Sequence, residues 1–238
     1  MARTIGLSQK LKLIWLNKAA EFSSEKLSEK EYKNKLTEYL SYEIESPTIL
    51  RKTSRNLMLV WFYNEIDSAS KLRPGAMELI KKYPEYAPVI HWCMLMLTFP
   101  VFRDLCHIMG RMLEFSDIIT LRQLKQKLYD DWGERQTLHY STDKIISTMK
   151  DLNVIETTKP GNYHVLVQSI SDNDMTRFML KSAMLSGNSD YYKLNELASL
   201  EVLFPFRYEL KKDYFINGTD FSVSNFGGEL IVSLADTL

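Results

Sequence analysis

The residues that could carry nucleophilic or metal chemistry are few and scattered along the chain. They are two cysteines and four histidines: Cys93, Cys106, His91, His107, His139 and His164. None of them falls into a CxxC, HExxH or HxxxH spacing that would bind zinc. Cys106 and His107 are adjacent, but neighbouring side chains on a helix point about 100° apart, so a Cys-His pair would need partners from elsewhere. We predict no metal site and no catalytic cysteine.

Acidic pairs and glycine loops give no stronger signal for an enzyme. The tight acidic pairs are Asp130-Asp131 and Asp172 with Asp174, all at predicted helix ends, where carboxylates commonly cap helices. No GxxxxGK[ST] or GxGxxG sequence is present, so no phosphate-cradling loop is encoded, and Gly227-Gly228 indicates a turn. We therefore predict a protein without catalytic residues and without a cofactor.

Basic residues favour a different chemistry, which is contact with phosphate groups. Thirty Lys and Arg balance thirty Asp and Glu, so the net charge of zero excludes a histone-like polycation. The charge is nevertheless uneven: residues 1–56 hold eleven basic and seven acidic groups, whereas residues 169–238 hold six and ten. The densest basic cluster is Arg51, Lys52 and Arg55.

Cysteine usage and hydropathy indicate the compartment. Cys93 and Cys106 lie in apolar helical stretches, as free buried thiols of a reducing compartment commonly do, and residues 1–12 lack the apolar core of a signal peptide. The most apolar run, residues 89–102, has fourteen residues, fewer than the roughly twenty that span a membrane. We predict a cytoplasmic protein with no membrane contact.

Residues 1–98 have the periodicity of a helical bundle, the first of three predicted domains. We expect a helix over 7–22 with Ser8 as its N-cap, and a second after the capping box formed by Ser28 and Glu31. A third helix is expected over 48–66, a break at Pro74-Gly75, and a buried helix over 89–98.

Residues 99–170 change to an alternation of helices and short strands. A helix to about residue 116 precedes the β-like pair Ile118-Ile119, and a capping box at Thr120 and Gln123 starts a helix that Gly133 ends. A helix over 141–152 is followed by two strands on either side of Pro160-Gly161.

This succession resembles a winged helix-turn-helix domain. The resemblance implies that the helix over 141–152 lies in the DNA major groove and that the hairpin, or wing, contacts the backbone. The predicted DNA-binding residues of this domain are Arg122, Lys125, His139, Tyr140, Ser141, Thr142, Lys144, Ser147, Thr148, Lys159, Asn162 and Tyr163, joined by Arg51, Lys52 and Arg55 of the bundle. Two features depart from the family: residues 132–140 form a long connection, and residues 117–168 contain seven basic and seven acidic groups.

Residues 171–238 form the third predicted domain, which ends in a hairpin. We expect helices over 174–185 and 192–200, alternating residues over 203–210, and a β-hairpin with strands at 221–225 and 229–234. The acidic balance of this segment favours a protein partner over DNA. The predicted fold class is therefore mainly α with small β-hairpins.

The overall plan also resembles the BrxA family of bacterial BREX phage-defence systems. The resemblance covers the order of elements over residues 5–170, with Trp92 and the Phe99-Pro100 junction in the apolar helix, and it includes no diagnostic motif. It implies a mostly helical DNA-binding protein within a larger assembly.

Two functional hypotheses follow. The first is a non-enzymatic protein that binds double-stranded DNA within a phage-defence or regulatory assembly. The alternative is a protein-interaction scaffold that uses the winged-helix fold without DNA binding, because one fold serves several functions.

Overall fold

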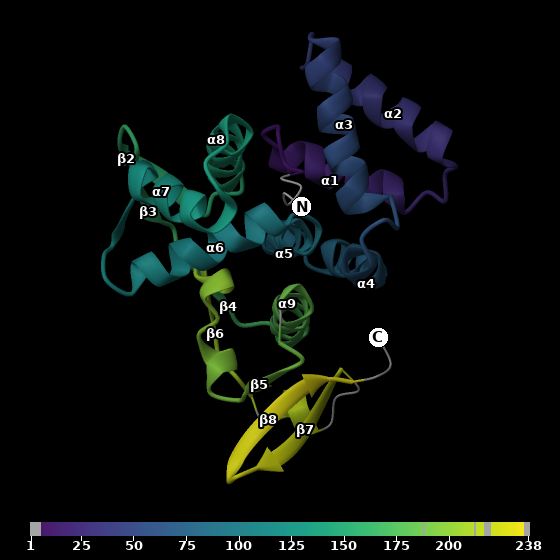
Figure 1. The fold of residues 1–238 in the computed structure, drawn as a ribbon. Helices are drawn as coiled ribbons and strands as arrows, with labels where there is room; N and C mark the ends of the chain where they lie inside the picture. The colour runs from purple at the N-terminus through teal and green to yellow at the C-terminus, as the bar shows by residue number, and fades with distance from the viewer. Residues whose placement is uncertain (1–5, 188, 212, 217–219, 236–238) are drawn as a thin grey trace.

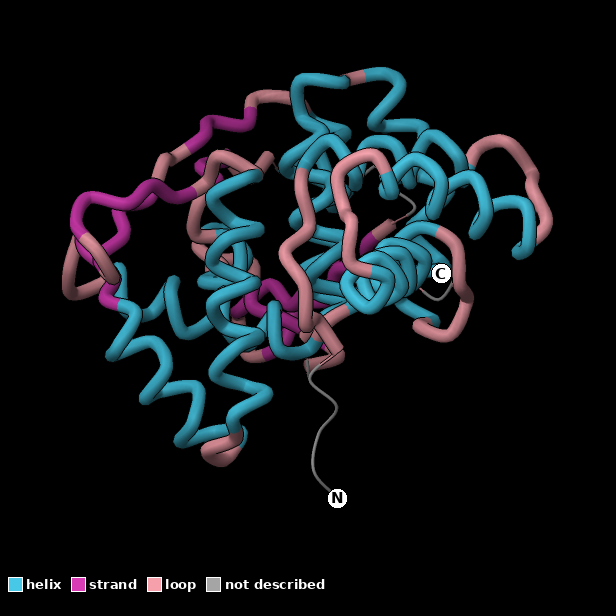
Figure 2. The backbone as a smooth tube through the Cα atoms, turned by 90° about the horizontal axis from the view of Figure 1, so that it is seen from above, coloured by secondary structure: helices cyan, strands magenta, loops and turns pink. Residues whose placement is uncertain are grey.

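Helices and short strands make up the chain, as the ribbon and backbone views show (Figures 1 and 2). The computed structural model describes residues 6–187, 189–211, 213–216 and 220–235. Residues 1–12 are predicted not to form a signal peptide, and the first five of these residues lie outside the described part of the chain. The predicted class, mainly α with small β-sheets, is confirmed.

Six helices form the first half of the described chain. They are α1 (Leu13–Ser23), α2 (Glu29–Ser41), α3 (Pro47–Trp61), α4 (Asp67–Lys82), α5 (Ala87–Thr98) and α6 (Pro100–Leu113), with a 3₁₀ turn, η1 (Pro84–Tyr86), before α5. The capping box of α2 is confirmed, since Ser28 and Glu31 exchange backbone and side-chain hydrogen bonds. The predicted start of the first helix is wrong: Lys12, not Ser8, is the N-cap of α1.

The predicted break at Pro74-Gly75 is also wrong, because both residues lie inside α4. Proline normally disrupts a helix interior, where it removes one hydrogen bond. Here the preceding residue, Arg73, is buried and donates to the backbone carbonyls of Val60, Phe62 and Tyr63 at the end of α3. These tertiary hydrogen bonds hold α4 in place across the proline.

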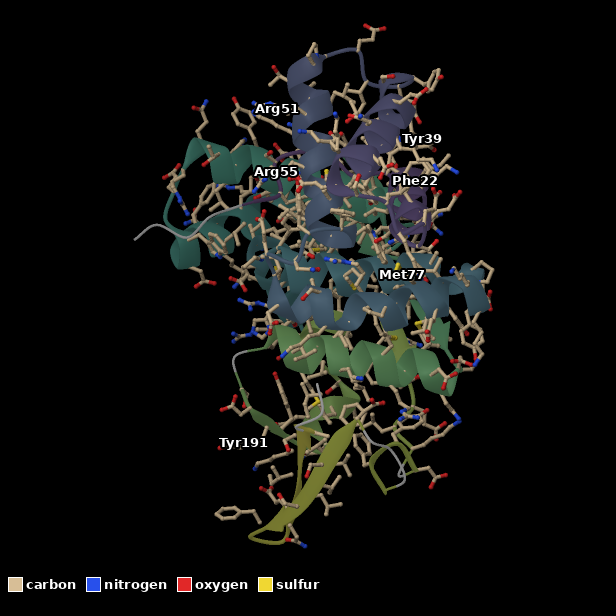
Figure 3. The ribbon with its side chains drawn as sticks, turned by 90° about the vertical axis from the view of Figure 1, so that its right-hand side faces the viewer. Phe22, Tyr39, Arg51, Arg55, Met77 and Tyr191 are labelled. Atoms are coloured by element: carbon tan, nitrogen blue, oxygen red, sulfur yellow. The ribbon has the colours of Figure 1, made fainter. Side chains whose placement is uncertain are left out.

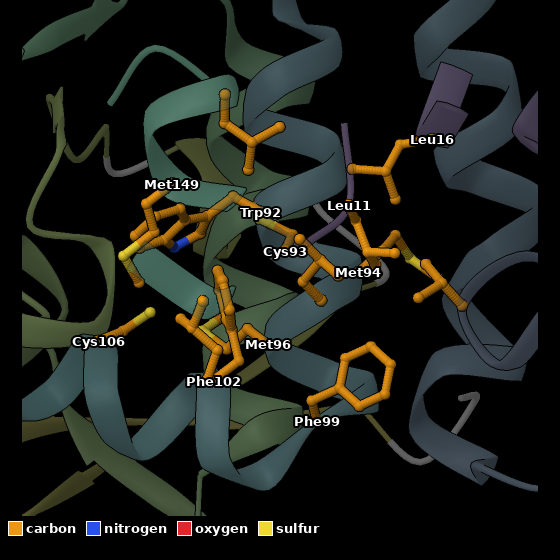
Figure 4. Packing of buried hydrophobic residues seen from close by; sticks show 14 of the residues in the cluster. Leu11, Leu16, Trp92, Cys93, Met94, Met96, Phe99, Phe102, Cys106 and Met149 are labelled. Carbon is orange, nitrogen blue, oxygen red and sulfur yellow. The ribbon is translucent and has the colours of Figure 1, made fainter. Parts of the chain in front are cut away.

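The apolar run at residues 89–102 forms the centre of the core. Every residue of α5 from Val89 to Thr98 is buried, and Trp92 packs against Phe102 (Figure 4). The ring of Trp92 also contacts those of Phe204 and Phe206. No single described helix is long and apolar enough to cross a membrane. Pro84–Thr98 and Pro100–Leu113 meet that test only as a pair, and the pair is bent by 115°.

One continuous hydrophobic cluster includes residues from all three predicted domains. It extends from Leu7 through α5 and α6 to Phe206, so the predicted boundary near residue 98 coincides with the bend between two helices that share a core. Gly110 of α6 allows two backbone segments to approach closely: a Cβ at this position would lie 2.3 Å from the backbone oxygen of Glu201.

The middle of the chain has the predicted order of helices and strands. After α6 come β1 (Ile118–Thr120), α7 (Leu121–Trp132), α8 (Gln136–Asp151), β2 (Ile155–Lys159) and β3 (Asn162–Val165). The strands form an antiparallel sheet in the order β1-β3-β2. Three predicted boundary residues are confirmed: Thr120 caps α7, and Gly133 and Asn153 have the positive φ angles of helix-ending residues.

The C-terminal part contains one long helix and two small sheets. Its elements are β4 (Gln168–Ile170), α9 (Asn173–Ser186), β5 (Tyr191–Lys193), η2 (Glu196–Ala198), η3 (Glu201–Leu203), β6 (Phe206–Tyr208), α10 (Asp213–Ile216), β7 (Phe221–Phe226) and β8 (Glu229–Leu234). β4 pairs with β6 in parallel, and the antiparallel sheet β5-β8-β7 contains the predicted hairpin. The predicted helix at 192–200 is wrong, because Tyr192 is paired with Val232 in that sheet.

Candidate nucleic-acid interface

The connection between α7 and α8 is three residues long, which corrects the expectation of a long connection. α8 begins at Gln136, one turn before the predicted start, and residues 133–135 form the link. Leu138 explains the difference, since it is buried and extends the apolar face formed by Ile145 and Met149 by two turns. That leucine, seven residues before Ile145, is the sequence signal that the prediction missed.

The turn of the β2–β3 hairpin is attached to the start of α7. The backbone N–H of Leu121 donates to the carbonyl of Gly161 over 2.7 Å. Beside this bond is a pocket of about 520 Å³ whose lining includes Arg122, Lys125, His139 and Asn162. The fold therefore brings four of the predicted site residues, from two helices and the hairpin, around one hollow.

One face of α8 is exposed to solvent and carries polar and basic side chains. The exposed residues of α8 are Gln136, Thr137, His139, Tyr140, Lys144 and Lys150, and Ser147 between the last two is half-buried. Tyr140 is 57% exposed and its ring packs edge-on against that of His139. Gln136 was missed by the sequence prediction because it was assigned to the connection.

Four predicted contact residues are buried, so the expectation that they face outward is wrong. They are Ser141, Thr142, Thr148 and Tyr163. The hydroxyl of Thr142 donates to the carbonyl of Leu138, four residues earlier in the helix. Thr148 donates to the carbonyl of Lys144 and accepts a hydrogen bond from the backbone of Leu11. The segment before α1 thus covers this side of α8.

Tyr163 is buried by the sheet. It lies in β3 between Ile119 of β1 and Thr157 of β2, and burial raises the pKa of its phenol. Its side chain therefore packs in the interior beneath the hairpin.

Lys125 contributes less free charge than the sequence suggested. Its side chain is only 12% exposed, and its ammonium group lies 2.7 Å from Oδ1 of Asp143. The same ammonium is 3.1 Å from Nε2 of His139, whose Nδ1 is 2.8 Å from the hydroxyl of Tyr129. Because lysine only donates, Nε2 of His139 accepts and Nδ1 carries the proton. This network joins α7 to α8.

Other cations of the interface are available to a ligand. Arg122, Lys144, Lys150 and Lys159 are exposed and form no ion pair with another described residue. Two acidic groups of α8 are already neutralised: Asp143 by Lys125, and Asp151 by Lys10 over 2.6 Å. The local balance at this surface is therefore more positive than the count over residues 117–168.

The basic cluster of the bundle lies on α3 and is exposed (Figure 3). Arg55 is 3.4 Å from the carboxylate of Glu65, and both side chains are more than half exposed. Arg55 also lines a cleft of about 800 Å³ together with Asp131 and Trp132 at the end of α7. Arg51 and Lys52 lie one turn earlier on α3 and do not line that cleft.

The groups considered for catalysis are buried or dispersed. Cys93 and Cys106 are buried thiols, and burial raises the pKa of Cys93 to about 12 and that of Cys106 well above its usual value. Both are protonated at neutral pH. Within the described parts of the chain, no three His, Cys, Asp or Glu side chains are grouped so as to hold a metal ion.

Comparison with known proteins finds no matching family model, no similar curated protein and no similar solved structure. The function must therefore be inferred from the residues of the interface.

Proposed function

We propose that this protein binds double-stranded DNA through a winged helix-turn-helix formed by α6, β1, α7, α8, β2 and β3. The observation that carries the proposal is the three-residue turn between α7 and α8, combined with a hairpin whose turn is bonded to the start of α7. In such domains the second helix of the turn lies in the major groove and the wing contacts the backbone. By this correspondence α8 is the recognition helix.

The exposed face of α8 supplies the groups for reading bases. Gln136 and Tyr140 are uncharged side chains with hydrogen-bonding capacity, and Lys144 follows one turn later. Glutamine pairs well with adenine edges and lysine with guanine edges in the major groove. The buried residues Ser141, Thr142 and Thr148 support the helix and take no part in this contact.

Phosphate contacts would come from the edges of the same surface. Arg122 lies in the first turn of α7 and lines the pocket beside Gly161, and Lys159 lies at the end of β2, next to Pro160 of the same lining. Arg51, Lys52 and Arg55 would extend the contact along α3.

The test measures affinity for duplex DNA as a function of salt. Each cation that neutralises a phosphate contributes about 0.9 to the slope of log K against log salt concentration, so we expect a steep decrease between about 50 and 200 mM salt. Replacing Lys144 and Lys159 by Glu should weaken binding about tenfold or more. The matched control replaces Lys26 and Lys30, exposed in and beside the α1–α2 connection, by Glu.

The outcomes separate the proposal from its alternative. Absence of binding at low salt, or equal effects of the two double variants, would reject this DNA interface. A protein-interaction scaffold, the second hypothesis, would retain its partners in nuclease-treated lysate. The resemblance to BrxA proteins supports a place in a phage-defence or regulatory assembly in the cytoplasm, and neighbouring methyltransferase and ATPase genes would strengthen that assignment.

A further inference from the structure

The strand β7 forms one edge of the sheet β5-β8-β7, in the hairpin that projects from the helices at the lower end of Figure 1. The N–H of Ala235 donates to the carbonyl of Asp220, so Asp220 and Ala235 are one of the hydrogen-bonded residue pairs between the chain segments of β7 and β8. Such pairs alternate along antiparallel strands. Ser222, Ser224 and Phe226 therefore direct their backbone groups toward β8.

The backbone groups of Val223 and Asn225 point the other way, toward the free edge. A bond on the far side of β8 agrees with this alternation: the N–H of Leu194 donates to the carbonyl of Leu230, which is opposite Asn225. No backbone hydrogen bond joins the outward N–H and C=O groups of Val223 and Asn225 to another described residue.

This edge lacks the features that usually prevent strand addition. Residues 221–226 contain no charged residue and no proline, and the pairing of β7 with β8 has no bulge. Phe226 is 79% exposed, and Val223 and Leu230 are 38% and 44% exposed. Natural edge strands are commonly protected by charge, proline or a bulge, and an edge without them can accept a further strand.

We propose that β7 pairs antiparallel with β7 of a second copy of this chain, with Ser224 opposite Ser224 of the second copy. Charge complementarity indicates which strand would pair with β7. Two identical uncharged strands bring no like charges together. An acidic or basic peptide, in contrast, would find no opposite charge on residues 221–226. The pairing gives a continuous six-stranded sheet and is independent of DNA binding.

Two identical antiparallel strands are related by a two-fold axis, and the residues on either side of β7 indicate which residue lies on that axis. If Ser224 lies on the axis, Phe226 lies opposite Ser222 of the second copy. Centred on Val223, the pairing would place Phe226 opposite Asp220, whose carboxylate is bound by Arg177 and Lys181, each over 2.8 Å. The first register also places Phe221 opposite Gly227, where no heavy atom lies within 4 Å of the position that a Cβ would occupy.

The contact is small, so the association is expected to be weak. One strand pair of five or six residues buries less than the ~1,600 Å² of a standard interface. Sedimentation velocity on the full chain from about 1 μM to about 1 mM, a span that brackets weak association, should therefore show a dimer fraction that increases with concentration. A monomer throughout this range would overturn the proposal.

Cysteine cross-linking tests the register. In a pair of residues that exchange no hydrogen bonds, the Cα atoms lie about 4.5 Å apart, within the range of a disulfide. With oxidised glutathione as the two-electron oxidant, Ser224→Cys should give a linked dimer. Ser222→Cys is the matched control on the same strand face, and it should not link, because its opposite residue is Phe226 of the second copy. Equal linking of the two variants would contradict this register.

A proline variant tests the free edge itself. Val223→Pro removes an N–H that points away from β8, and proline is tolerated at such positions of edge strands. We expect a monomer at all concentrations with an unchanged far-ultraviolet circular dichroism spectrum. Val223→Lys, which adds a charge to the edge strand, should also abolish the dimer. Persistence of the dimer in both variants would overturn the proposal.

Discussion

The backbone N–H of Leu11 donates a hydrogen bond to Oγ1 of Thr148 over 3.0 Å, and this bond attaches the segment before α1 to α8, the helix proposed to contact DNA. Next to it, Asp151 accepts from the backbone N–H of Leu13 and pairs with Lys10. The N-terminal segment thus covers one face of α8 and leaves the other exposed. The bundle and the proposed DNA-binding helix are joined by specific polar contacts as well as by the common core.

Replacing Thr148 by Val should destabilise the protein with little loss of side-chain volume. The change leaves the buried N–H of Leu11 without an acceptor, which costs about 1–3 kcal/mol. Urea unfolding measures the difference. Ser147→Ala is the control: its hydroxyl, half-buried, donates to the carbonyl of Asp143 within the helix. A Thr148→Val protein as stable as Ser147→Ala would show that the bond to Leu11 contributes nothing.

Local signals in the sequence predicted several element boundaries correctly. The caps at Ser28 and Thr120, the helix end at Asn153 and the hairpin turn at Gly161 each depend on residues within a few positions of one another. The conformations of these caps and turns are determined by neighbouring residues in the sequence.

Several of the predictions that failed depend on distant residues. Thr148 has the polarity of an exposed residue, and its burial follows from Leu11, 137 positions away. Tyr192 was predicted to begin a helix, and it lies in a strand because Val232 pairs with it. Within the candidate site, the predicted contact residues Arg122, Lys144 and Lys159 are exposed, whereas the neutralisation of Lys125 by Asp143 required the packing of α7 against α8.

Arg122 and Lys127 lie on the same helix and should have different effects on DNA binding. Arg122 lines the pocket beside the hairpin turn, whereas Lys127 lines a separate hollow with Phe115 and Ile118. We expect Arg122→Gln to reduce the slope of log K against log salt by about 1, and Lys127→Gln to leave it unchanged. Fluorescence anisotropy with one labelled duplex measures both slopes. The reverse ranking would place the DNA on the other side of α7.

Two helical glycines should respond in opposite directions to alanine. At Gly110 a Cβ would clash with the backbone oxygen of Glu201, so Gly110→Ala should lower the free energy of unfolding by about 2 kcal/mol or more. At Gly75, inside α4, no heavy atom lies within 4 Å of that position, so Gly75→Ala should raise it by about 0.5–1 kcal/mol. Thermal unfolding of the two variants in parallel checks both signs.

His91 should make the protein less stable in acid. Burial lowers the pKa of this histidine to about 3 in the folded protein, from 6.5 when exposed. Its Nε2 lies 2.7 Å from Oδ1 of Asn17, and its ring packs edge-on against Trp61. Between pH 6.5 and 3 the unfolded chain binds a proton at this site that the folded chain does not. The free energy of unfolding therefore decreases as the pH falls, by about 1 kcal/mol per pH unit.

A comparison with His91→Phe isolates this contribution. Phenylalanine keeps an aromatic ring against Trp61 and does not titrate, but it removes the hydrogen bond to Asn17. We expect the variant to be less stable than the original protein at pH 7 and the difference to shrink as the pH is lowered, because only the histidine protein loses stability by protonation at this site in the unfolded state. Urea unfolding of both proteins between pH 7 and about pH 4 measures that difference. A constant difference across this range would mean that residue 91 takes up no proton on unfolding, contrary to its burial as a neutral ring.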